Sequence, residues 1–186
     1  GCTALGTLDI VGREGPFELG LDIARCAIGV FGLPSEQRVI LGLRLSSLEQ
    51  WSGVGEPLTT LEATLAVART TGDQDLVAAA LRTRAMLVRC RGSAVDAVPD
   101  LLEAIALARG GPVPSDTLLS AISTLGGTYR EMGRIDEARA CWEEVVEGRR
   151  QVEDNDEHLA HALGNLALLE RRAGRYDRAR ALYQDA

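Results

Sequence analysis

Residues 133–140 read Gly-Arg-Ile-Asp-Glu-Ala-Arg-Ala, and residues 174–181 read Gly-Arg-Tyr-Asp-Arg-Ala-Arg-Ala, a displacement of 41 residues. The same step backwards leads from the glycine and the first alanine of this stretch to Gly92 and Ala97. A constant period of this length is typical of proteins built from stacked helical hairpins. The sequence therefore predicts an array of repeated units.

Each unit reads as two helices joined by a glycine turn. On both sides of Gly133, apolar residues recur every three or four positions, which is the period of a helix with one buried face. We predict first helices at 36–51, 73–91, 115–132 and 156–173, second helices at 57–71, 94–109, 134–152 and 175–186, and a further helix at 17–30. Ser35, Asp73 and Ser115 are predicted N-caps, because such side chains accept hydrogen bonds from the first N–H groups of a helix.

The units are expected to form a single domain over residues 1–186. Their approximate limits are 1–34 (partial), 35–72, 73–111, 112–153 and 154–186 (truncated). A small Ala138 followed by a large Trp142 should let neighbouring helices pack closely. Trp51, Trp142 and Tyr129 are predicted core anchors. Because the sequence stops at Ala186 within a predicted helix, we expect a fragment, or an array without its natural caps.

Composition favours an all-α fold and excludes several classes of protein. The chain has 25 Ala and 27 Leu, and aromatic residues make up only 4% of it, which favours helices over strands. It has 20 Arg, no Lys and a net charge of -7, which argues against direct nucleic-acid binding. The longest apolar stretch is far shorter than the roughly 18 residues of a membrane span. With no visible signal peptide, we expect a cytoplasmic protein without a membrane partner.

No group of residues suggests catalysis, a metal or a cofactor. The four cysteines lie far apart and form no CxxC pair, so we expect free thiols. His158 and His161 are three residues apart but lack a third placed ligand. No nucleophile motif, P-loop or dinucleotide motif is present. The sequence therefore predicts no enzyme, no metal site and no cofactor.

The repeated unit resembles the tetratricopeptide repeat (TPR). That family places a Leu and a small residue in the first helix, then an aromatic, a turn Gly, and an Ala and an aromatic in the second helix. The matching residues here are Leu125, Gly126, Tyr129, Gly133, Ala138 and Trp142, with a second copy at Leu166, Ala167, Gly174, Tyr176, Ala179 and Tyr183. The period of 41 is similar to the long-hairpin TPRs of kinesin light chains and bacterial regulators. In one departure, Glu170 occupies the position of Tyr129.

The resemblance implies a right-handed superhelix whose first helices line a concave groove. The groove residues that it implies are Arg82, Met86, Arg89, Ser123, Arg130, His161, Asn165, Arg171 and Arg172. Arg89, Arg130 and Arg171 occupy one equivalent position, each 41 residues from the next. Arginine offers a fork of donors suited to carboxylates, so we expect a protein or peptide partner that is acidic or bound by its C-terminus. The alternative is that these arginines only solvate the surface and favour the helix dipole.

The expected function is a non-enzymatic, peptide-binding scaffold. One alternative is a sensory or regulatory TPR segment of a larger bacterial signalling protein or transcription regulator, since the exclusive use of Arg suggests a high-GC source. Another is a self-association module that forms a homodimer through uncapped ends. An enzyme on the same scaffold is disfavoured by the missing chemistry.

Overall fold

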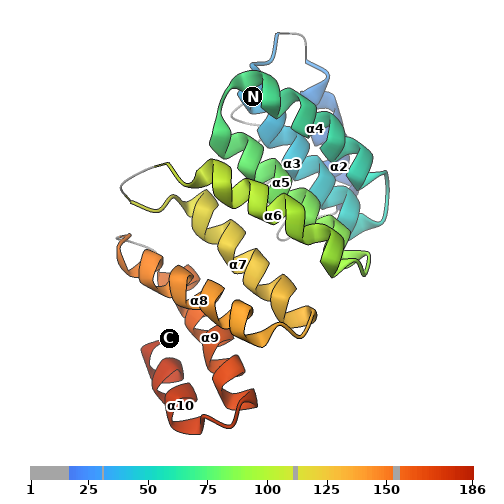
Figure 1. Cartoon of the computed structure of the whole chain (residues 1–186). Coiled ribbons are helices and arrows are strands. Elements are labelled where there is room, and N and C mark those ends of the chain that lie inside the picture. The colour runs from blue at the N-terminus through green and yellow to red at the C-terminus, as the bar shows by residue number, and fades with distance from the viewer. Residues whose placement is uncertain (1–16, 31, 111–112, 153–155) are drawn as a thin grey trace. The chain divides into compact units, whose positions relative to one another are not determined.

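The computed structural model describes residues 17–30, 32–110, 113–152 and 156–186, and all regular secondary structure in these residues is α-helical (Figure 1). Residues 1–16 of the predicted partial unit 1–34 lie outside the described residues. The prediction of an all-α fold is confirmed.

Helices follow the predicted order closely. The first helices are α3 (Ser35–Ser52), α5 (Gln74–Cys90), α7 (Asp116–Glu131) and α9 (Asp156–Arg172). The second helices are α4 (Pro57–Thr71), α6 (Ala94–Ala108), α8 (Ile135–Arg150) and α10 (Tyr176–Asp185), and α2 (Phe17–Ile28) precedes them. Every predicted boundary is confirmed to within two residues.

Two of the three predicted N-caps are confirmed. Ser115 accepts a hydrogen bond from the backbone N–H of Leu118 at 3.1 Å. Asp73 Oδ1 accepts from the N–H groups of the residues two and three positions later, at 2.9 and 3.2 Å. The prediction for Ser35 is wrong, because Pro34 takes the N-cap position with φ -54° and Ser35 becomes the first helical residue. The fixed φ of proline suits this position, and the proline has no N–H to satisfy.

The described chain divides into two compact units, Gly1–Leu87 and Val88–Ala186. In the first unit, α3 packs against both α2 and α4. Its core joins the helices through buried small and branched side chains, namely Leu21, Ala24, Leu41, Leu45 and Leu48. Trp51 lies in the last turn of α3 but is 77% exposed, so its predicted role as a core anchor is wrong.

In the second unit, each helix from α6 to α10 packs against the next along the chain. The core around α8 and α9 contains Ala138, Trp142, Leu166 and Leu169. A Cβ added at Gly126 of α7 would lie 3.1 Å from ring atoms of Trp142. The small residue in α7 therefore makes room for the buried indole of α8, as the alternation of small and large residues predicts.

Replacing a turn glycine and a helix glycine with alanine should change the free energy of unfolding in opposite directions. Gly133 has φ +77°, so Gly133→Ala should lower the free energy of unfolding by about 1–2 kcal/mol, the cost of a Cβ in a left-handed conformation. Gly164 lies inside α9 with nothing within 4 Å of an added Cβ. Gly164→Ala should therefore raise this free energy by roughly 0.5–1 kcal/mol. Urea unfolding followed by circular dichroism measures both changes, and a shift of the same sign in both variants would contradict the assignment of the turn.

Candidate functional site

The three equivalent arginines of the predicted groove have different surroundings. Arg89, in the last turn of α5, places its Nε 3.7 Å from Glu131 Oε2 at the end of α7. A Cβ added at Gly127 would lie 3.0 Å from Arg89 Nη1. Arg89 therefore extends over α7, where an acidic side chain already offsets part of its charge.

Arg130 has an aromatic neighbour instead of an acidic one. Its Cζ lies 6.0 Å from the ring centroid of Trp142, at the limit of a cation–π interaction. The residue 41 positions after Glu131 is Arg172. Glu131 is the acidic partner of Arg89, and the equivalent position in the next unit holds Arg172 instead of an acidic residue.

Arg171 and Arg172 end helix α9, and both are exposed. Within the described part of the chain, neither side chain makes an ion pair or a side-chain hydrogen bond. Two adjacent guanidinium groups at a helix C-terminus form a local positive region, because their electrostatic potentials add and no carboxylate of the described residues offsets them.

His161 and Asn165 are brought together one turn apart on α9. The Asn165 amide nitrogen lies 3.3 Å from His161 Nδ1. Their spacing and that of Arg172 place all three on one side of the helix, with Arg171 on its flank. We call His161, Asn165, Arg171 and Arg172 the α9 surface.

The remaining predicted groove residues lie in α5 and α7. Arg82 and Met86 belong to the first compact unit, where Arg82 Nη1 lies 3.6 Å from Met86 Sδ. Ser123 is half-buried in α7, four residues before Gly127. The predicted site is thus divided, with Arg82 and Met86 in the first unit and all its other members in the second.

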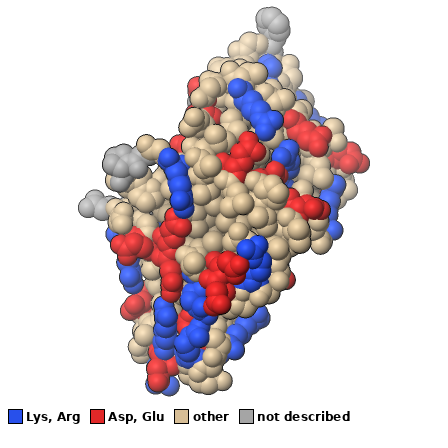
Figure 2. Space-filling view, viewed as in Figure 1, with Lys and Arg blue, Asp and Glu red and all other residues tan. Residues whose placement is uncertain are grey.

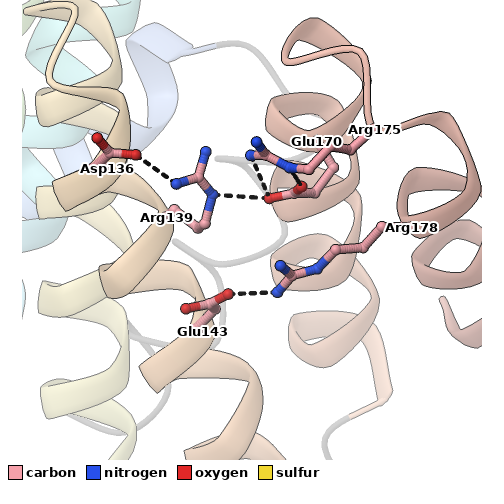
Figure 3. Close-up of polar contacts among 6 residues, drawn as sticks. All are labelled: Asp136, Arg139, Glu143, Glu170, Arg175 and Arg178. Carbon is pink, nitrogen blue, oxygen red and sulfur yellow. Dashed lines mark hydrogen bonds and ion pairs between the residues drawn. The ribbon is translucent and has the colours of Figure 1, made fainter.

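Sequence reasoning missed a buried ionic cluster that joins α8, α9 and α10 (Figure 3). Glu170 of α9 is fully buried, and its Oε1 accepts hydrogen bonds from Arg139 Nε at 2.9 Å and from Arg175 Nη2 at 3.3 Å. Its second oxygen, Oε2, accepts from Arg175 Nε. Asp136 also accepts a hydrogen bond from Arg139. The only sequence signal was the acidic residue at the position of Tyr129.

The cluster keeps Glu170 ionised. Hydrogen bonds from Arg175 and then from Arg139 hold the pKa of this carboxyl below its ordinary value, against burial, which acts to raise it. Tyr129 is the equivalent residue of the preceding unit, and its ring centroid lies 4.3 Å from Cζ of Arg134. Both units therefore place an arginine of the turn against the same first-helix position, once on a ring and once on a carboxylate.

Other charged residues of the second unit are paired on the second helices. Arg109 bonds Glu144 at 2.8 Å, and Arg178 bonds Glu143 at 2.6 Å. On the face drawn in Figure 2, arginine and acidic side chains lie side by side over the C-terminal helices. This pairing on α8 and α10 contrasts with the arginines at the end of α9, which have no acidic partner among the described residues.

Reactive groups are sparse in the described residues. No three His, Cys, Asp or Glu side chains gather there in a way that could hold a metal ion. Burial raises the pKa of the Cys141 thiol to about 11, so this cysteine is protonated at neutral pH. None of the described helices has both the length and the apolar character that a membrane span requires.

Comparison with known proteins identifies the repeat. The family model described as tetratricopeptide repeat matches residues 117–186. The structure is similar to that of BtubC (BKLC) from P. vanneervenii, with a TM-score of 0.78 and 19% identity over 95% of this chain and 74% of that one. A kinesin light chain-like protein of Podosopora anserina with nearly identical TPR-like repeats gives a TM-score of 0.73 and 18% identity, over 98% and 91% of the two chains.

A thermophilic TPR protein of Thermus thermophilus gives a TM-score of 0.66 and 19% identity, over 99% of this chain and 88% of that one. No curated protein matches the chain in sequence. The likeness to solved structures extends the fold beyond the residues of the family match, and the resemblance drawn from the repeated residues is confirmed. Residues 117–186 therefore carry the tetratricopeptide repeat, and the other described helices share the fold of TPR-like proteins.

Proposed function

We propose that this chain is a non-enzymatic protein-interaction scaffold, and that the α9 surface binds an acidic segment of a partner protein. TPR folds serve in general as protein-interaction scaffolds, which supports the first part. The observation that supports the second part is the pair of exposed arginines, Arg171 and Arg172, which have no acidic partner in the described residues of a chain with net charge -7.

The contrast among the arginines favours this end of the predicted groove. Binding a carboxylate at Arg89 requires competition with Glu131, which already lies 3.7 Å away. At Arg171 and Arg172, an incoming carboxylate displaces only water. Charge-assisted hydrogen bonds from arginine are strong and often bidentate, so this difference should direct an acidic segment to α9.

His161 and Asn165 add polar groups to the same surface. Asn165 can donate from its amide and accept at its oxygen, which suits the backbone of an extended peptide. We therefore infer that the arginines attract the acidic side chains and that the amide orients the peptide backbone.

The experiment uses a fluorescein-labelled poly-Glu peptide and fluorescence anisotropy. We expect saturable binding by the wild type, weakened by added salt because exposed charges are screened. The double variant Arg171→Gln and Arg172→Gln should bind at least about tenfold more weakly, since each lost charge-assisted hydrogen bond costs on the order of 1.5–3 kcal/mol. Arg89→Gln should have a smaller effect, because Glu131 already neutralises part of its charge.

The matched control is Arg178→Gln with Arg180→Gln on the second helix α10, which changes the net charge by the same amount. This control should bind like the wild type if the α9 surface is the site. Equal losses in the two double variants would show only a response to net charge and would contradict the proposal. A neutral Gly/Ser peptide of the same length should not bind.

Two alternative functions, a homodimer and a regulatory segment, have weaker support. Exposed Tyr176 and Tyr183 on α10, at 67% and 48%, are compatible with a homodimer. The regulatory role in a larger bacterial protein, and the cytoplasmic location, stay predictions of the sequence.

A further inference from the structure

The first compact unit contains a pocket that the proposed scaffold function does not use. It has a volume of about 160 Å³, and its lining residues belong to helices α2, α3 and α4. Its apolar walls are formed by Ile28, Gly42, Leu45, Ala63, Thr64 and Val67. None of these residues belongs to the arginine-bearing surface of the second unit.

At one wall of the pocket, helices α3 and α4 approach closely because Gly42 has no side chain. Gly42 is buried in α3, and a Cβ added there would collide with Thr64 Oγ1 of α4. The Thr64 hydroxyl donates to the Thr60 carbonyl at 2.7 Å. Its hydrogen is therefore already used inside α4, and Thr64 adds no free donor to the pocket wall.

The second threonine in the lining is also engaged. Thr60 Oγ1 donates to Glu49 Oε2 at 2.7 Å, and Glu49 Oε1 lies 3.5 Å from Arg25. The donors of both wall threonines are thus satisfied within the protein. A ligand in this pocket would meet aliphatic surface rather than competing hydrogen-bond donors.

Among the described residues of the lining, Arg38 alone is charged. It is exposed in the first turns of α3, and it makes no ion pair or side-chain hydrogen bond within the described residues. An apolar pocket with a single unpaired guanidinium group complements a molecule that is apolar over most of its length and anionic at one end.

We propose that this pocket binds a small carboxylic acid of about six carbons, with its apolar tail among Ile28, Leu45 and Val67 and its carboxylate at Arg38. The size follows from the volume, since an apolar cavity of about 150 Å³ takes a molecule such as benzene. The occupant is a free small molecule, because the pocket has room for one such group. The site would give the first unit a ligand response of its own, separate from peptide binding on α9.

The test uses hexanoate as the probe and the Ile, Leu and Val methyl resonances of the full chain as the readout. Saturable shifts should be confined to the methyl groups of Ile28, Leu45, Val67 and their neighbours in the first unit. Arg38→Gln should weaken hexanoate binding about tenfold and leave binding of neutral 1-hexanol unchanged, because only the charged end loses its partner. The control Arg44→Gln, on the same helix but outside the lining, should bind hexanoate like the wild type.

A second pair of variants tests the cavity itself. Ala63 and Ala66 are both exposed on α4, but only Ala63 lines the pocket. Ala63→Leu should fill the space and abolish binding of both probes, whereas Ala66→Leu should preserve it, with circular dichroism showing that both variants fold. Unsaturable shifts, shifts centred on the second unit, equal effects of the two alanine variants, or no effect of Arg38→Gln on hexanoate would overturn the proposal. None of these results depends on whether poly-Glu binds to α9.

Discussion

Replacing Trp142 with Ala is expected to lower the free energy of unfolding by about 3–5 kcal/mol, the usual cost of removing a large buried aromatic. The side chain is 2% exposed and packs with Ala138, Leu166 and Leu169. Its ring also fills the space next to Gly126. The variant therefore leaves a cavity where α7, α8 and α9 meet, and a repeat unit that buries its stripe only against neighbours cannot compensate elsewhere.

The control for this substitution is Trp51→Ala. Trp51 is 77% exposed, so its loss should change the free energy of unfolding by no more than roughly 0.5 kcal/mol. Urea unfolding followed by circular dichroism measures both variants, and amide hydrogen exchange should show the loss of protection concentrated in α7–α9. Comparable destabilisation by the two substitutions would mean that the assignment of the core is wrong.

Glu170→Gln is expected to destabilise the second unit by about 1–3 kcal/mol at pH 7, because arginines placed to bond a carboxylate lose their charged acceptor. Glu170 is fully buried and is bonded by both Arg139 and Arg175. The control is Glu143→Gln, which removes the exposed pair with Arg178 in the same region (Figure 3). Such an exposed pair contributes only about 0–1 kcal/mol.

The effect of Glu170→Gln should depend on pH in one direction. Because its arginine partners lower the pKa of Glu170 in the folded chain, the ionised carboxylate contributes stability above the unfolded pKa of roughly 4.3. This contribution is lost as the pH falls through the lower pKa of the folded state. The difference between wild type and variant should thus be largest near neutral pH and shrink under acidic conditions in urea titrations. A difference that grew on acidification would contradict the assigned direction of the pKa shift.

The helices were predictable because their signals are local. The spacing of Leu118, Ile122 and Leu125 indicates a buried helical face, and Gly133 indicates the turn after it. The prediction for Trp51 was wrong because an apolar residue at a helix end can face either the core or the solvent. Only the packing of α3 decides between the two. The prediction for Ser35 was wrong because Pro34 competes for the same cap.

The candidate site was predictable only as a set of equivalent positions. The 41-residue step correctly identified Arg89, Arg130 and Arg171 as equivalent, but not what each would contact. Their neighbours are Glu131, Trp142 and, for Arg171, no acidic group in the described residues. The pocket beside Arg38 had no sequence signal at all, because its walls come from three helices that meet only in the folded chain.

Sequence alone thus predicted the repeat, the helical hairpins and the resemblance to tetratricopeptide repeats, since periodicity and turn glycines act within one unit of the chain. The tertiary structure decided which charges are paired, where Glu170 finds its arginines, and where a cavity is left. These properties depend on side chains that meet across helices, and equivalent positions in successive units meet different residues there. The repeat determines where a residue lies on the backbone, but the residues of the neighbouring helix determine whether its side chain is buried or paired.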